Sequence, residues 1–111
     1  MSYKFIGEII NGFDPPSGVN LIIKGLADDK IILAPQKSYF YDNSGDNPLK
    51  FSLVPSSGVP GEMRRVNAEV KNCTEKVTPT AVGWDVEITA SSESDPAEFS
   101  ILFFEKGMED D

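Results

Sequence analysis

The sequence has 111 residues, of which 40% are hydrophobic and 25% are charged, and its net charge is −8. This length and composition predict one globular domain and exclude an intrinsically disordered chain. Because an acidic surface repels phosphate groups and anionic lipids, neither nucleic-acid binding nor membrane binding is expected.

The sequence lacks the residues that the common catalytic and metal sites need. It contains no histidine and one cysteine, Cys73. Histidine-based nucleophile sites, imidazole or thiolate zinc sites and an intrachain disulfide are therefore excluded. We expect a protein that is not an enzyme and that has no cofactor.

Targeting signals are also missing from the sequence. The first ten residues lack the features of a signal peptide, and no apolar run is long enough for a membrane helix. We therefore expect a cytoplasmic protein, with a removed leader or a leaderless export route as the alternatives.

The first half of the sequence alternates apolar segments with breaks rich in Pro and Gly, residues that interrupt the hydrogen bonds of a sheet. The apolar segments predict five strands: Tyr3–Ile10, Val19–Lys24, Lys30–Ala34, Ser38–Tyr41 and Leu49–Val54. The most polar of the breaks, Asp42–Pro48, is predicted to be a loop.

Met63–Cys73 fits two patterns. Its apolar residues repeat at intervals of two, as in a strand, but a subset of them also repeats at helical spacing. We predict a strand, because the segments on both sides are strands.

Thr80–Ala90 shows the clearest strand pattern in the chain. One face carries Val82, Trp84, Val86, Ile88 and Ala90, and the other face is mostly polar. The single tryptophan, Trp84, is therefore predicted to lie in the core. The last strand, Phe99–Glu105, is predicted to form an antiparallel hairpin with Thr80–Ala90.

Seven to eight short strands at regular spacing are typical of an antiparallel β-sandwich. The fold class is therefore all-β, with an immunoglobulin-like or jelly-roll-like sandwich favoured and a small β-barrel as the alternative. The domain is predicted to span residues 1–106, and the acidic residues 107–111 are predicted to form a flexible tail.

The polar loop carries candidate metal ligands. Asp42, Ser44 and Asp46 have the spacing with which an EF-hand loop begins, but the glycine and glutamate that complete that loop are missing. Calcium held together with Asp28 and Asp29 is the alternative to the simpler interpretation, a polar turn.

Aromatic residues precede this loop. Tyr39, Phe40 and Tyr41, together with Trp84, would form a platform for a sugar ring if they shared one exposed face. The candidate ligand-binding residues are Tyr39, Tyr41, Asp42 and Asp46.

Cys73 is expected to be a partly buried and inert thiol. Lys71 and Lys76 would lower its pKa if it were exposed.

These patterns favour a non-enzymatic binding module that presents loops or a sheet edge to a protein partner or to a second copy of itself. A carbohydrate-binding, lectin-like domain, assisted by calcium, is the alternative. An enzyme that works with carboxylates alone is the second alternative.

Overall fold

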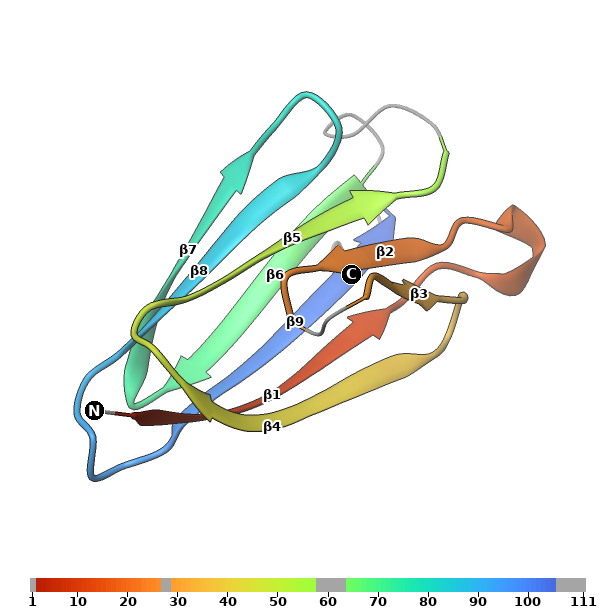
Figure 1. The fold of residues 1–111 in the computed structure, drawn as a ribbon. Helices are drawn as coiled ribbons and strands as arrows, with labels where there is room; N and C mark the ends of the chain where they lie inside the picture. Colours follow the sequence, from red (N-terminus) through yellow and green to blue (C-terminus); the bar gives the residue numbers. More distant parts are fainter. Residues whose placement is uncertain (1, 27–28, 58–63, 106–111) are drawn as a thin grey trace.

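The computed structural model describes residues 2–26, 29–57 and 64–105, which form nine strands in two sheets packed as a sandwich (Figure 1). The predicted all-β sandwich is thereby confirmed. The strands are β1 (Tyr3–Asn11), β2 (Leu21–Lys24), β3 (Ile31–Leu33), β4 (Ser38–Gly45), β5 (Leu49–Pro55), β6 (Arg64–Lys71), β7 (Cys73–Pro79), β8 (Trp84–Ala90) and β9 (Ala97–Glu105).

One turn of 3-10 helix, η1 (Pro15–Ser17), lies between β1 and β2. Within the described ranges, no helix is long and apolar enough to span a membrane. The predicted tail, residues 107–111, lies outside the described residues.

The strand order is β4-β1-β9-β6 in the four-stranded sheet and β3-β2-β5-β8-β7 in the five-stranded sheet. Neighbouring strands are antiparallel except β1 and β9, which run parallel. The first and the last strand, β1 and β9, are therefore the two inner strands of the four-stranded sheet, and each has a neighbour on both sides.

The core lies between the sheets, where the alternating apolar faces of the strands meet. The Trp84 side chain is 6% exposed, and its ring lies edge-on to Phe103 with the ring centroids 5.6 Å apart. Phe13 stacks on the same Phe103 ring at 4.7 Å. The prediction that Trp84 belongs to the core is confirmed, as is the apolar face that it shares with Val86 and Ile88.

The prediction of a hairpin between the last two strands is wrong. β8 lies between β5 and β7 in one sheet, whereas β9 lies between β1 and β6 in the other. The connection Ser91–Pro96 therefore crosses from sheet to sheet. The physical reason is that both strands have a strongly apolar face, and opposite sheets allow these two faces to pack against each other.

Several strand boundaries also differ from the prediction, and two of these differences lie at turns. The strand predicted over Thr80–Ala90 begins at Trp84, because residues 80–83 form the turn from β7, in which the Thr80 hydroxyl accepts a hydrogen bond of 3.0 Å from the Gly83 N–H. Val82, predicted to be buried, is 60% exposed in that turn.

Asn72 marks the other boundary. It adopts a left-handed conformation (φ 61°) and separates β6 from a further strand, β7, which the sequence patterns did not predict. For Arg64–Lys71 the choice of strand over helix is confirmed, whereas Met63 lies outside the described residues.

The side chain of Asn11 is fully buried at the end of β1. Its amide nitrogen donates hydrogen bonds of 2.9 Å to the carbonyl oxygens of Val19 and Leu33, and its amide oxygen accepts one of 3.1 Å from the backbone N–H of Phe13. Val19 precedes β2 and Leu33 ends β3, so this side chain joins the two sheets.

Gly7 lies in the middle of β1 and faces the core. It is paired with Phe99 of β9, and a Cβ atom at position 7 would lie only 2.1 Å from the Phe99 ring. The Phe99 ring therefore occupies the space that any side chain at position 7 would need.

We expect Asn11→Ala to lower the free energy of unfolding by about 3 kcal/mol, because it leaves two carbonyl oxygens and one N–H unpaired in the core. Urea denaturation measures the change. Asn67→Ala is the control, since Asn67 is exposed in β6, and it should change the same free energy by less than about 0.5 kcal/mol. Equal losses in the two variants would contradict the role of the buried amide.

Gly7→Ala is expected to lower the free energy of unfolding by about 1–3 kcal/mol, because the new methyl group displaces the Phe99 ring. In the matched variant Gly45→Ala, the Cβ atom meets nothing within 4 Å, so the melting temperature should stay the same or rise slightly. A melting temperature of Gly7→Ala equal to that of the unmodified chain would show that the core adapts without cost.

Candidate functional site

The predicted loop Asp42–Pro48 is partly a strand, because β4 continues to Gly45. Backbone pairing with β1 extends to Tyr3 opposite Gly45, and Lys4 of β1 contacts the Asp42 carboxylate with an Nζ–Oδ1 distance of 2.5 Å. Polar composition predicted a loop here, but hydrogen bonding to a neighbouring strand decides the conformation.

Asp42 and Ser44 lie on the outer face of β4, whereas Tyr39 and Tyr41 lie on its inner face. Asp46 is exposed beyond the end of the strand. The structure therefore does not bring the four candidate ligand-binding residues together on one surface.

The aromatic residues are divided in the same way. Tyr41 is 9% exposed, and burial, together with the neighbouring Tyr39, raises the pKa of its phenol. Trp84 is in the core, and Phe40 points outward with 63% of its surface exposed. These four rings do not form the platform that the sequence suggested.

The candidate calcium ligands are not gathered into a cluster in the described residues. Asp42 is engaged by Lys4, and Asp28 lies outside the described residues. In the part of the chain that the structure describes, no three acidic, histidine or cysteine side chains are placed to hold a metal ion. Calcium binding stays a prediction.

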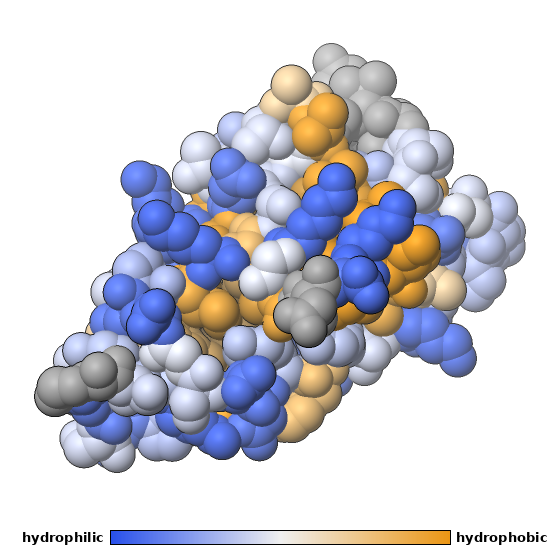
Figure 2. All heavy atoms as spheres, viewed as in Figure 1, coloured by the Kyte–Doolittle hydropathy of each residue, from blue (hydrophilic) through white to orange (hydrophobic). Residues whose placement is uncertain are grey.

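A groove of about 500 Å³ lies on the outer face of the five-stranded sheet. Its lining comes from four adjacent strands and consists mainly of side chains that alternate with the buried ones: Lys24, Lys50, Ser52, Lys76, Thr78, Asp85 and Glu87. Figure 2 shows hydrophilic side chains over this part of the molecule, with hydrophobic atoms visible between them.

Strand pairing arranges these side chains in two rows across the sheet. In the first row Lys24 pairs with Ser52, Ser52 with Asp85, and Asp85 with Thr78. In the second row Glu87 lies between Lys50 and Lys76. Both carboxylates thus lie on β8, and the lysines lie on strands to either side of it.

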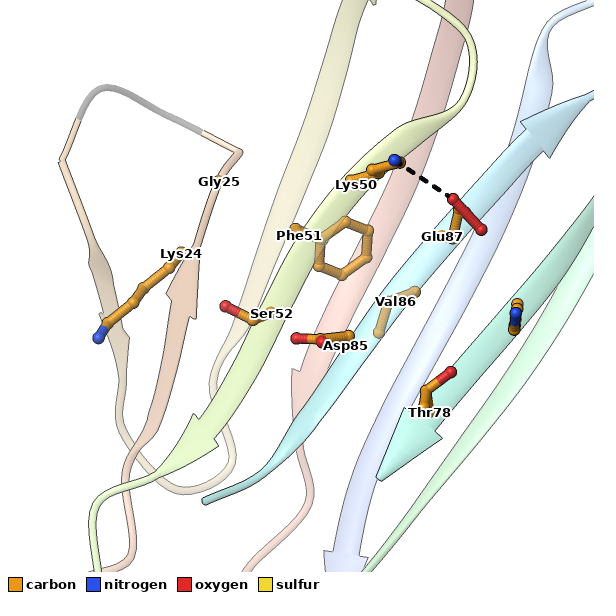
Figure 3. A pocket seen from close by; sticks show the side chains of 10 residues that line it. Lys24, Gly25, Lys50, Phe51, Ser52, Thr78, Asp85, Val86 and Glu87 are labelled. Carbon is orange, nitrogen blue, oxygen red and sulfur yellow. Dashed lines mark ion pairs between the residues drawn. The ribbon is translucent and has the colours of Figure 1, made fainter. Parts of the chain in front are cut away.

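The side chains differ in how they are paired. Lys50 reaches toward Glu87, with 3.7 Å between Nζ and Oε2 (Figure 3). The side chain of Asp85 points from β8 toward Ser52 on β5. Among the described residues, Lys24 and Lys76 form no salt bridge. The groove therefore offers two unpaired ammonium groups, an exposed carboxylate and two hydroxyl groups to a ligand.

Three lysines and two carboxylates give this groove a small positive charge in a chain whose net charge is −8. The groove could not be predicted from the sequence, because its residues come from four strands whose order in the sheet is not a local property. The available signal was that Lys24, Lys50 and Lys76 each occupy an outward position of a strand.

The chain matches no model of a known protein family and no curated protein. Comparison with solved structures finds a similarity to a bacterial adhesin from Mobiluncus mulieris that contains intramolecular disulfide, isopeptide and ester bond cross-links. The sequences are 8% identical, the TM-score is 0.49, and the similarity covers 92% of this chain and 41% of the adhesin chain. This chain thus spans less than half the length of that protein.

Cys73 lies at the start of β7 and is half-buried. Its Sγ atom donates a hydrogen bond of 3.4 Å to the carbonyl oxygen of Glu98. Burial, with the nearby carboxylates of Glu75 and Glu98, raises the pKa of the thiol, while backbone hydrogen bonds oppose this change. A raised pKa leaves less thiolate, the reactive form, at neutral pH.

We expect the folded protein to react with a disulfide reagent more slowly than the same chain unfolded in urea. The rate measured against pH should have its midpoint above that of the unfolded chain, because the folded state favours the protonated thiol. A midpoint at or below the value of the unfolded chain would contradict this description of Cys73.

Proposed function

We propose that the protein is a non-enzymatic binding module whose ligand lies across the groove on the outer face of the five-stranded sheet. The observation that supports this proposal is the groove itself. Donors and acceptors from four strands converge there on an open surface, held by a packed sheet beneath. A rigid scaffold with converging polar groups is the arrangement that ligand sites use.

A binding role is favoured over catalysis by the surroundings of the two groove carboxylates. A carboxylate enzyme needs one acid in an apolar pocket, where it keeps its proton until it donates it. Asp85 is exposed, and Glu87 lies 3.7 Å from Lys50. Neither carboxylate therefore has the apolar surroundings that such an acid needs.

The ligand class that fits this lining is an acidic oligosaccharide. Its carboxylate or sulfate groups would accept hydrogen bonds from Lys24 and Lys76, and its hydroxyl groups would donate to Asp85. A purely anionic ligand would be repelled by Asp85, and a neutral ligand would gain no charge attraction from the unpaired lysines. The mixture of charges therefore favours a ligand with both kinds of group.

The proposal predicts that a uronic-acid oligosaccharide binds the protein, as measured by isothermal titration calorimetry, and that a neutral oligosaccharide of the same length binds more weakly. Lys76→Glu should weaken binding of the acidic oligosaccharide by about tenfold or more, since it replaces an attraction with a repulsion. Lys37→Glu makes the same change of charge at an exposed position between β3 and β4 and should leave binding unchanged.

Asp85→Ala separates specific binding from simple charge attraction. If Asp85 accepts hydrogen bonds from ligand hydroxyls, its removal weakens binding. If the surface only attracts anions, removal of a negative charge strengthens binding. Stronger binding by Asp85→Ala, equal losses in the two lysine variants, or no binding of the acidic oligosaccharide would each overturn the proposed ligand.

A further inference from the structure

The sandwich has four edge strands among the described residues: β4 and β6 in one sheet, β3 and β7 in the other. An edge strand presents unpaired backbone N–H and C=O groups that can pair with another chain. Proteins block such edges with short strands, prolines or charged side chains, especially lysine.

Three of the four edges carry these blocking features. β3 has three residues and is flanked by Lys30 and Pro35. β7 contains Glu75 and Lys76 and ends at Pro79. The third edge, β6, carries a glutamate and several basic residues within the sequence RRVNAEVK.

Within the strand itself, β4 lacks this protection, and Lys37, which precedes Ser38, lies before the paired residues. Its eight residues, SYFYDNSG, include no lysine, arginine or proline and a single acidic residue, Asp42. The segment is rich in aromatic residues, which favour strands. Figure 1 shows β4 at the margin of the four-stranded sheet, with β1 on its inner side.

The β4 edge is also held in place. Tyr41 is buried and Tyr39 packs against the core, so the inner face of the strand is anchored over its first half. An edge that is already ordered needs no further ordering when another strand pairs with it.

The outer face of β4 indicates what kind of segment would pair there. Phe40 is 63% exposed, and its partner in register on β1 is Glu8, which is exposed. Asp42 follows two residues along the same face. The Asp42 carboxylate is already paired with Lys4, whereas Glu8 forms no salt bridge among the described residues. A cationic side chain beside Phe40 would therefore lie over an aromatic ring and close to the free carboxylate of Glu8.

We propose that β4 is a docking edge for an extended basic peptide, which adds to the four-stranded sheet as a further strand and places a lysine or arginine beside Phe40. Backbone hydrogen bonds to the β4 edge would provide affinity, and the cation beside Phe40 and Glu8 would provide selectivity. The net charge of −8 attracts such a peptide and repels a second copy of the same chain.

This site is distinct from the groove, because the two belong to different sheets. Docking of a peptide therefore does not depend on the proposed oligosaccharide. The Lys76→Glu variant separates the two sites, because it should weaken oligosaccharide binding and leave peptide binding intact.

The test uses the full chain and three short synthetic peptides. The first alternates lysine and valine, the second has glutamate in place of lysine, and the third is the first peptide with alternate backbone nitrogens methylated. Affinity is measured by calorimetry, and hydrogen exchange followed by NMR shows which amides become protected. We expect the lysine peptide alone to bind, and new protection to appear in β4.

Phe40→Lys adds both a charge and a blocking residue to the edge and should weaken binding of the lysine peptide by about tenfold or more. Val82→Lys is the matched control, because Val82 is 60% exposed in the turn between β7 and β8. The Val82→Lys and Lys76→Glu variants should both bind the lysine peptide about as tightly as the unmodified chain does. Phe40 and Val82 are both exposed, so the melting temperatures of Phe40→Lys and Val82→Lys should equal that of the unmodified chain and thus show that the variants fold.

Several results would overturn the inference. No binding of the lysine peptide would exclude a basic partner at this edge. Equal binding of the methylated peptide, or equal losses in Phe40→Lys and Val82→Lys, would show attraction by net charge without strand pairing. A concentration-dependent dimer in sedimentation that Phe40→Lys abolishes would show that a second copy occupies the edge.

Discussion

The buried amide of Asn11 is the interaction on which the arrangement of the two sheets depends. It lies at the end of β1 in one sheet and bonds to backbone groups beside β2 and β3 in the other. Backbone bonds from Asn11 N–H to the Lys37 carbonyl and from Gln36 N–H to the Asn11 carbonyl tie in the start of β4 as well. Hydrophobic packing alone allows sheets to slide, whereas directional bonds in a dry core fix their relative position.

This fixed arrangement separates the two surfaces that we propose to be functional. The groove lies on the outer face of the five-stranded sheet, and β2, with Lys24 at its end, forms one side of it. β4 follows directly from the segment that Asn11 holds and forms an edge of the other sheet. Both surfaces are therefore built on strands whose inner faces are packed, so their polar and exposed groups are held in place without a ligand.

The charges of the molecule are distributed in keeping with these two roles. The groove has more lysines than carboxylates, whereas the exposed Glu8 lies opposite the exposed Phe40 in a chain of strongly negative net charge. The two surfaces would therefore attract ligands of opposite charge. Because they belong to different sheets, a charge reversal at one surface has little direct electrostatic effect on the other at physiological salt.

The sequence alone determined which face of the most regular strand, β8, is buried, because alternation is a local property. Trp84, Val86 and Ile88 show this plainly. For Arg64–Lys71 alternation also fitted a helix, and the neighbouring strands gave the correct choice. The tertiary structure decided strand pairing, which depends on residues far apart in the chain. Pairing placed β8 and β9 in different sheets, gathered the groove from four strands, extended β4 through a polar segment and buried Asn11, which lies just beyond the predicted strand Tyr3–Ile10.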